Sequence, residues 1–278
     1  ACSSDKSDDK GDAGNAGTSD TTDTTTGGDS AHKLTIGVMQ SPSTHDPQAT
    51  NEKKRYQSKL IYDSLMAMNP ETGEVEPLLA ESVAYLDELT LQVKLRQDVT
   101  FTNGQGLTAE DVLYSLQNVY GVGQMASYFE CYDWDATEIV DDYTINFKFT
   151  KEYGPAISLL ATYDIYCKAD LEGDTALDAD AWMTAPNGTG PYYCVENVDS
   201  SHCTYRVKDN YWGTTPECEE VTYKYYSEAS TMYIDFEAGN LDAAIGLSET
   251  DAQRVLNGEA PASTVYSVNP VRDCLLVV

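Results

Sequence analysis

The residues with the widest chemical repertoire in this chain are its seven cysteines and three histidines, and their spacing limits what they can do. No two cysteines form a C-x-x-C pair, and no histidine lies at ligand spacing from another histidine or a cysteine, so zinc-ribbon, thioredoxin-like and catalytic-zinc interpretations fail. The sequence also lacks G-x-S-x-G, H-E-x-x-H, G-x-x-x-x-G-K and the calcium pattern D-x-D-x-D-G. We therefore predict that the chain is not an enzyme and holds neither a metal nor a cofactor.

Carboxylates are the most abundant reactive groups, but their abundance makes each of them a weak signal. The sequence has 46 Asp and Glu against 17 Lys and Arg, which gives a formal net charge of −29. A charge of this sign and size repels nucleic acid and anionic lipid headgroups, so neither is expected as a primary partner. Asp133 and Asp135 are more typical of a solvated loop than of a glycosidase pair, and a hydrolase is the least favoured class.

One glycine pattern matches the consensus of a dinucleotide-binding loop. Residues 121–126, GVGQMA, fit G-x-G-x-x-A, but a dinucleotide-binding loop must leave a strand and open a helix. The residues before Gly121 have helical periodicity, which excludes this interpretation.

Two cysteines are expected near each other in space. Residues 192–194 and 203–207 predict two strands of a hairpin that turns around Asp199, Ser200 and Ser201. Cys194 and Cys203 can then lie across from each other, and both a disulfide and a pair of free thiols stay open.

Cys2 is set apart from the other cysteines by its surroundings. It follows Ala1 and precedes Ser3 and Ser4, which resembles the acylated cysteine of a bacterial lipoprotein after its signal peptide has been removed. Residues 3–31 contain no large apolar side chain and predict a flexible tether with a mean reach of about 30 Å. No stretch of about 18 apolar residues occurs, so the lipid chains on Cys2 are the only expected contact with a membrane.

The stretch around which the chain is organised is residues 89–117. Leu89, Leu91, Val93 and Leu95 alternate with polar residues and predict a strand with one buried face. Asn103, Gly104 and Gly106 predict a turn, and Thr108 with Asp111 forms a capping-box pattern in front of an amphipathic helix.

The wording of this stretch resembles the family 5 solute-binding proteins of ABC importers, a group that includes oligopeptide-, dipeptide- and nickel-binding components. The family motif V-F-x-x-G-x-x-L-T-A-E-D-V-x-Y-S-L is matched at Val99, Phe101, Gly104, Leu107, Thr108, Ala109, Glu110, Asp111, Val112, Tyr114, Ser115 and Leu116. Further matches span residue 33 to the end, namely residues 62–65, 76–82, 143–149, 187–192, 209–213 and 237–242. Two positions depart from the family: His45 replaces a leucine and Val83 replaces a tryptophan.

The resemblance implies a mixed α/β fold, periplasmic-binding-protein-like of class II. We expect a tether over 1–31, an incomplete lobe I made of 32–61 and 185–278, a small inserted subdomain over 62–184, and no second lobe. Cys274 to Val278 predict an apolar strand that ends at the C-terminus, and we expect it to leave an open sheet edge.

The resemblance also implies a function. The chain is expected to be the lipid-anchored extracytoplasmic binding component of an ABC importer that captures peptides on the outer face of a bacterial membrane and delivers them to the transmembrane permease subunits. Alternatives are a membrane-tethered sensor on the same fold and a binder of nickel or sugar. The 278 residues alone are expected to bind peptides weakly. The predicted ligand contacts are Thr50, Asn51, Glu52, Met125, Tyr128, Thr189 and Gly190.

Overall fold

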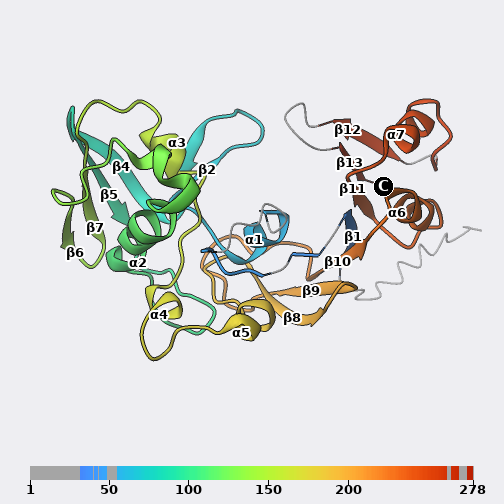
Figure 1. Ribbon diagram of the computed structural model, residues 1–278, viewed down its shortest axis with the longest axis horizontal. Helices are drawn as coiled ribbons and strands as arrows, with labels where there is room; N and C mark the ends of the chain where they lie inside the picture. Colours follow the sequence, from blue (N-terminus) through green and yellow to red (C-terminus); the bar gives the residue numbers. More distant parts are fainter. Residues whose placement is uncertain are drawn as a thin grey trace, which may run out of the picture. The chain divides into compact units, whose positions relative to one another are not determined.

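The computed structural model describes residues 32–39, 41–42, 44–48, 55–261, 264–268 and 274–277. Within this part of the chain the strands form three sheets, of seven, four and two strands (Figure 1). The helices are α1 (Arg55–Ile61), α2 (Ala109–Tyr114), η2 (Ser115–Tyr120), η3 (Gly123–Phe129), α3 (Ala156–Leu160), α4 (Lys168–Leu171), α5 (Ala179–Thr184), α6 (Ala229–Glu237) and α7 (Glu249–Leu256).

The four-stranded sheet is antiparallel and comes from one continuous stretch of chain. Its order is β4-β5-β7-β6. The strands are β4 (Ala80–Asp87), β5 (Thr90–Leu95), β6 (Glu138–Asp141) and β7 (Thr144–Lys148). Strand β5 confirms the predicted alternation at Leu91, Val93 and Leu95, which are buried, and at Lys94, which is exposed. It is wrong at the start of the strand, where Leu89 is 39% exposed and Thr90 is buried. A short hairpin accompanies the sheet, formed by β2 (Met66–Met68) and β3 (Val75–Pro77).

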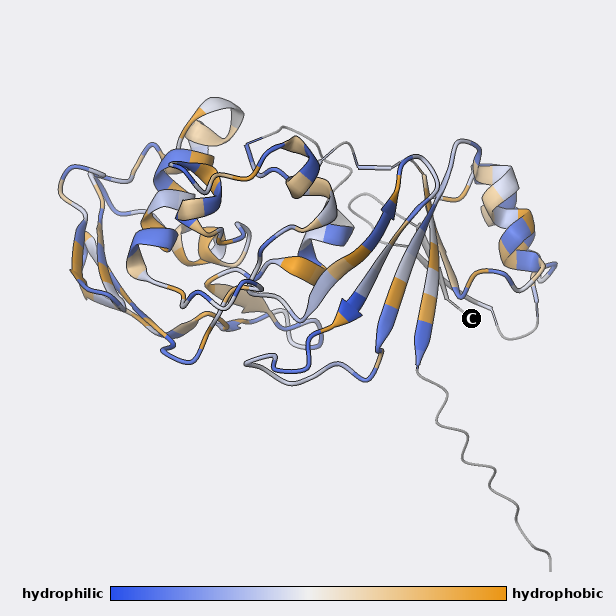
Figure 2. Cartoon of the chain, turned by 90° about the horizontal axis from the view of Figure 1, so that it is seen from below, coloured by the Kyte–Doolittle hydropathy of each residue, from blue (hydrophilic) through white to orange (hydrophobic). Residues whose placement is uncertain are grey.

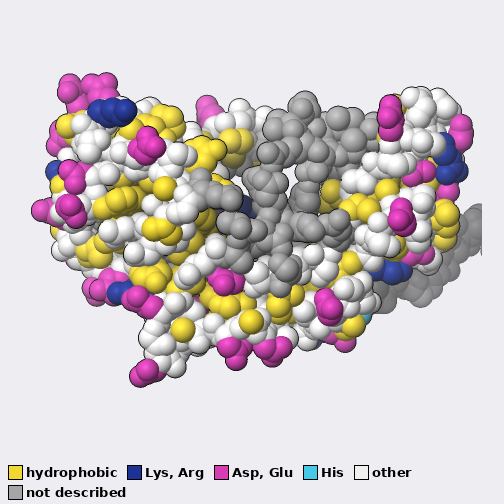
Figure 3. All heavy atoms as spheres, viewed as in Figure 1, with side chains coloured by type: hydrophobic (Ala, Val, Ile, Leu, Met, Phe, Trp, Pro, Cys, Tyr) yellow, Lys and Arg dark blue, Asp and Glu magenta, His cyan; other side chains and the backbone are white. Residues whose placement is uncertain are grey.

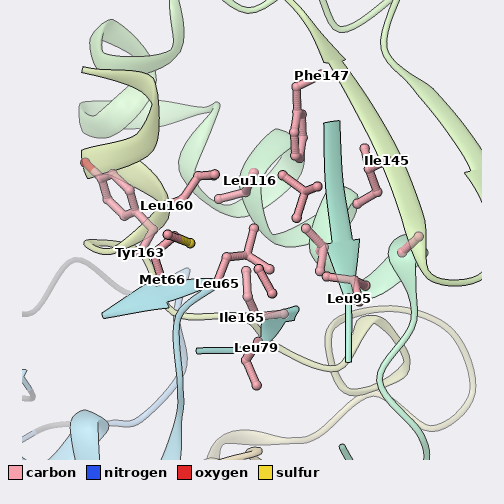
Figure 4. Close-up of a cluster of buried hydrophobic side chains, with 14 of the residues drawn as sticks. Leu65, Met66, Leu79, Leu95, Leu116, Ile145, Phe147, Leu160, Tyr163 and Ile165 are labelled. Atoms are coloured by element: carbon pink, nitrogen blue, oxygen red, sulfur yellow. The ribbon is translucent and has the colours of Figure 1, made fainter. Parts of the chain in front are cut away.

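The buried faces of these elements enclose the core that we call the contiguous core, which draws its buried residues from 65–167. Figure 4 shows Leu95, Ile145 and Phe147 on the strands pointing toward Leu116 on η2 and toward Leu65 and Ile165. The predicted capping box confirms where α2 begins: the carboxylate of Asp111 accepts hydrogen bonds from the backbone N–H of Thr108 at 2.9 Å and from its hydroxyl at 2.7 Å. Because α2 continues as a π-helical turn to Tyr120, the glycine pattern at 121–126 follows a helix, as expected.

The seven-stranded sheet is mixed and draws on distant parts of the sequence. Its order is β12-β13-β11-β1-β10-β9-β8. The strands are β1 (Lys33–Met39), β8 (Tyr192–Val198), β9 (His202–Val207), β10 (Glu220–Tyr226), β11 (Ala243–Ile245), β12 (Val265–Val268) and β13 (Cys274–Val277). Apolar and polar residues alternate along several of its strands in Figure 2. Most of its buried apolar residues, with Ile61, Tyr62, Tyr166 and Trp182, make what we call the assembled core.

Strand β1 lies parallel to both of its neighbours, β10 and β11. The connection from β10 to β11 runs through α6, which contacts β10, β1 and β11, so the helix crosses over β1. Gly37 makes this crossing possible: a Cβ atom there would lie 2.6 Å from Leu241 Cδ1 and 2.8 Å from Met232 Cγ. Any larger residue at position 37 would have to displace the side chains of Leu241 and Met232.

The expectation of an open edge at the C-terminal strand is wrong. Strand β13 lies between β11 and β12 and pairs with both. The sheet edges are β12 and β8. Position within a sheet is set by long-range pairing, which the apolar pattern of 274–278 does not encode.

The two cores are supplied by different segments. Leu65 and Ile165 belong to the contiguous core, whereas Tyr62 and Tyr166 belong to the assembled core. Ser64 and Asp164 form an isolated antiparallel bridge, and the N–H of Ile165 donates to the carbonyl of Asp63 at 2.8 Å. The chain therefore leaves the assembled core and returns to it through two adjacent segments.

Candidate functional site

The turn Asn187–Gly190 is packed against the end of α1. The N–H of Gly190 donates to the carbonyl of Ile61 at 2.7 Å. A Cβ atom at Gly188 would lie 2.0 Å from the same carbonyl oxygen, and one at Gly190 would lie 2.6 Å from the Ile61 carbonyl carbon. Both positions therefore require glycine, because the two backbones touch.

Thr189, between these glycines, has an exposed fraction of 0% and its polar atoms bond within the protein. Its hydroxyl accepts from the N–H of Asp63 at 3.3 Å, and its carbonyl accepts from the indole N–H of Trp212 at 3.0 Å. The guanidinium of Arg96 lies 5.0 Å from the centre of the Trp212 ring. The turn thus holds together three segments that are far apart in sequence.

Two opposite charges are buried beside this turn. Asp63 and Lys208 have exposed fractions of 7% and 9%, and the Lys208 ammonium donates to the carbonyl of Gly188 at 2.8 Å. Burial raises the pKa of Asp63 to about 6, although the hydrogen bond from Thr189 and the positive charge of Lys208 both act to lower this pKa. Burial also lowers the pKa of Lys208 to about 8, and the negative charge of Asp63 opposes that change. Each charge therefore reduces the cost of burying the other.

A row of tyrosine rings leads away from the turn. Tyr62, whose ring would meet a Cβ atom at Gly188, lies 4.5 Å from Tyr166 between ring centres. The hydroxyls of Tyr166 and Tyr120 are 3.5 Å apart, and Tyr120 lies 4.4 Å from Tyr163. Tyr163 in turn lies 6.4 Å from Tyr128. The row is therefore continuous from a buried turn to a surface tyrosine.

The row reaches solvent at η3, at two of the predicted ligand contacts. Tyr128 is 50% exposed and Met125 is 39% exposed. The hydroxyl of Tyr163 lies 3.7 Å from the Met125 sulfur, which fixes the methionine beside the row. Exposed aromatic and thioether groups on a rigid base suit contact with an apolar or aromatic group of a ligand.

The predicted residues thus fall into three groups. Met125 and Tyr128 lie together on the surface, and Thr189 with Gly190 lies buried at the other end of the tyrosine row. Thr50, Asn51 and Glu52 lie outside the described residues. The ligand-binding roles of all seven remain predictions.

The described residues on either side of 50–52 are attached to the seven-stranded sheet. His45 Nε2 lies 3.1 Å from the hydroxyl of Tyr205, and the Gln57 amide donates to the hydroxyl of Tyr225 at 2.9 Å. His45 and Gln57 have exposed fractions of 1% and 2%. The histidine that replaces the family's leucine is therefore a buried hydrogen-bonding residue.

Sequence reasoning missed the buried charges and most of the tyrosine row. Asp63 lies in the stretch Tyr62–Leu65 and Lys208 precedes a second family motif, so both were adjacent to recognised patterns. The position of an ionisable residue next to a family motif was the signal that could have indicated these two buried charges. The row itself joins residues 62, 120, 163 and 166, a combination with no period in the sequence.

The described residues contain no group of three or more His, Cys, Asp or Glu side chains placed to hold a metal ion. In the same part of the chain, no helix combines the length and apolar character needed to cross a bilayer. Figure 3 shows acidic side chains over many parts of the visible face and fewer basic ones.

Residues 74–272 match the family model described as bacterial extracellular solute-binding proteins, family 5 Middle. The match covers more than half of the chain, and the chain belongs to this family of ABC-importer binding proteins, as the sequence motifs predicted.

Individual relatives are distant in sequence and close in fold. The dipeptide-binding protein of Escherichia coli is 27% identical over 224 residues, which cover 69% of this chain and 41% of that protein. The nickel-binding periplasmic protein of the same organism is 23% identical over 210 residues, covering 72% and 38%. MoaA of A. tumefaciens R10, solved with mannopinic acid, superposes with a TM-score of 0.73 at 24% identity, covering 86% of this chain and 50% of that one.

These comparisons confirm the predicted mixed α/β fold of periplasmic binding proteins. The chain spans about 40% of the length of these two curated relatives and half of the length of the solved one.

Proposed function

We propose that this protein is the extracytoplasmic substrate-binding component of an ABC importer and that its solute is a peptide. The observation that carries the proposal is the exposed pair Met125 and Tyr128 at the surface end of the tyrosine row. A peptide offers apolar side chains that can contact this pair. It also offers a backbone whose contacts with the protein are compatible with many different peptide side chains. Binding shifts the protein toward a closed form that docks on the permease.

One observation supports peptide over a metal complex, whereas the relatives do not separate the two: the dipeptide binder matches 69% of this chain and the nickel binder 72%. His45, a natural candidate for a metal contact, is buried and bonded to Tyr205. Because one relative is a nickel-binding protein, a nickel complex is the second candidate for the solute.

Calorimetry on protein expressed from the complete coding region tests the proposal. Titration with a mixture of short peptides is compared with titration of nickel in the presence of histidine. We expect heat from peptides only. Heat from nickel with histidine, and none from peptides, would overturn the peptide assignment.

A matched pair of variants locates the site. Tyr128→Ala is expected to weaken peptide binding about tenfold, since it removes a contact surface worth about 1.5 kcal/mol. The control is Tyr85→Ala, because Tyr85 on β4 is similarly exposed, at 46%, and lies outside the tyrosine row. Equal affinities for the two variants would remove Tyr128 from the site.

We also propose that the inserted subdomain corresponds to the contiguous core. Tyr166 and Trp182 lie in the assembled core, so the return point near Ile165 suits the boundary better than residue 184. The adjacent segments at Ser64 and Asp164 support an insertion with two neighbouring ends.

Membrane attachment through a lipidated Cys2 is a further part of the proposal, supported by the sequence around that cysteine. Cells fed a radiolabelled fatty acid are expected to label the protein. Cys2→Ser is expected to release it into the medium, whereas Cys218→Ser, the control, leaves it with the membrane fraction. Release of the wild-type protein would contradict the anchor.

A further inference from the structure

The β8–β9 hairpin places two thiols in contact beneath the surface of the assembled core. The sulfur atoms of Cys194 and Cys203 lie 3.5 Å apart, and both cysteines are free. Cys203 has an exposed fraction of 0% and Cys194 one of 8%. In the described part of the chain, this is the one pair of cysteine sulfurs within hydrogen-bonding distance.

The strand register explains why these sulfurs meet. Cys194 pairs with Tyr205 and Cys203 pairs with Asn197, so the two cysteines are diagonal neighbours on one face of the hairpin. Diagonal neighbours are ordinarily too far apart for a disulfide. Here the pairing is irregular between Cys194 and Glu196, and the two sulfur atoms lie 3.5 Å apart.

From this geometry we propose that Cys194 and Cys203 are a reversible dithiol that small-molecule disulfides oxidise to an intramolecular disulfide. The sulfurs must approach from 3.5 Å to a bond length of about 2.05 Å, which a small rotation of the two side chains supplies. Because Cys203 is fully buried and Cys194 is only 8% exposed, most other thiols cannot reach Cys203, and the two cysteines react with each other.

The order of the two steps follows from exposure. Cys194 is the more exposed sulfur, and β8 is an edge strand that can open locally without breaking the sheet. The thiol of Cys203 can donate to the Cys194 sulfur; this contact lowers the pKa of Cys194, and the same contact together with burial raises the pKa of Cys203. Cys194 is therefore the first nucleophile.

The reaction balances with one external disulfide. The Cys194 thiolate attacks a sulfur of oxidised glutathione, forms a mixed disulfide and releases one glutathione. Cys203 then loses its proton, attacks the Cys194 sulfur and expels the second glutathione, which takes up that proton. The protein loses two hydrogen atoms and the glutathione disulfide gains them.

The sequence offers a direct assay on the full chain. Trypsin cleaves after Lys168 and Arg206, so the two cysteines share one peptide that contains no other cysteine. Glu196 lies between them, and a second digestion with a glutamate-specific protease separates the halves unless a disulfide joins them. After oxidised glutathione, we expect this peptide to be lighter by two hydrogen atoms, its halves to stay joined, and dithiothreitol to separate them.

Matched variants and a bridging reagent complete the test. Cys194→Ser and Cys203→Ser are each expected to abolish the joined peptide, while Cys167→Ser, which removes another buried thiol, leaves it unchanged. Phenylarsine oxide, which needs two neighbouring thiols, is expected to bridge the same peptide in the unmodified protein, so the proposal stays testable if a variant fails to fold. Two free thiols in this peptide while Cys218 carries glutathione, or a disulfide from either cysteine to Cys218, would overturn the proposal.

Discussion

The two cores of this protein are built in opposite ways. The contiguous core uses one uninterrupted stretch and an antiparallel sheet, whereas the assembled core joins β1 to strands that begin more than 150 residues later. Its central strand pairs with β10 and β11 in parallel, which requires long connections. The longest match to a family motif, over residues 99–116, falls in the contiguous core.

The largest expected effect is the loss of stability when a buried phenylalanine is truncated, and it can be compared between the contiguous core and the cluster beneath α6. Phe147 and Phe236 are 0% and 1% exposed, but Phe147 lies in the contiguous core and Phe236 in a small cluster beneath α6. Phe147→Ala is expected to lower the free energy of unfolding by about 4–5 kcal/mol, and Phe236→Ala by about 3 kcal/mol, since fewer neighbours lose contacts. Urea denaturation of both variants measures the difference. Equal losses would show that the two environments are equally packed.

A pH experiment compares Asp63, at the connection between the cores, with Asp235, on α6. The pKa of Asp63 is raised to about 6, so between pH 4 and pH 6 the folded protein binds more protons than the unfolded chain. Stability attributable to Asp63 therefore falls by about 3 kcal/mol as pH rises through this window. Asp63→Asn is expected to remove that decline in the free energy of unfolding, measured by denaturation at several pH values.

Asp235 is a control, because its pKa is shifted in the opposite direction to that of Asp63. The ammonium of Lys224, at 2.5 Å, together with the Tyr226 hydroxyl and the Asn240 amide, lowers the pKa of Asp235 to about 2. Its contribution is present above about pH 4 and is lost as pH falls toward 2. Asp235→Asn should therefore lower stability at neutral pH and leave the decline between pH 4 and pH 6 intact. The same response from both variants would contradict the assignment to Asp63.

A smaller loss of stability is expected when a glycine is changed to alanine where two segments touch, and it can be compared with the same change at a glycine that has open space around it. Gly188→Ala is expected to lower the free energy of unfolding by about 1–3 kcal/mol, because its Cβ atom would meet the Ile61 carbonyl at 2.0 Å. Gly106→Ala meets no atom within 4 Å and is expected to leave stability unchanged within about 0.5 kcal/mol. Thermal unfolding of both variants tests the comparison, and an unchanged midpoint for Gly188→Ala would show that the turn moves freely.

The smallest effect compares two helix caps. Thr108 caps α2 beside the contiguous core, and Ser248 caps α7, where its hydroxyl accepts from the N–H of Asp251 at 3.1 Å. Each change to alanine is expected to cost about 1 kcal/mol. Thr108→Ala should cost slightly more, since Asp111 also accepts from the N–H of Lys168 at 2.8 Å and joins α2 to α4. A larger loss for Ser248→Ala in chemical denaturation would contradict this order.

The sequence predicted local elements well and long-range placement poorly. Strand 33–39, the strand ending at Leu95 and the cap at Thr108 follow from alternation and capping chemistry, which a few adjacent residues encode. The position of β13 inside its sheet and the burial of Asp63 with Lys208 depend on residues far away in sequence. The family motifs identified Met125, Tyr128 and Thr189 as candidates, but only the packing separated the exposed pair from the buried turn.

The adjacency of Ser64 and Asp164 has a consequence for how this chain could be altered. A stretch whose two ends touch can be lengthened, shortened or exchanged for another without rerouting the remainder. Residues 65–163 also contact the remainder through Thr102 with Gly188 and Arg96 with Trp212, but their two ends meet at one bridge. We therefore expect a short linker in their place to leave the order of strands in the seven-stranded sheet unchanged.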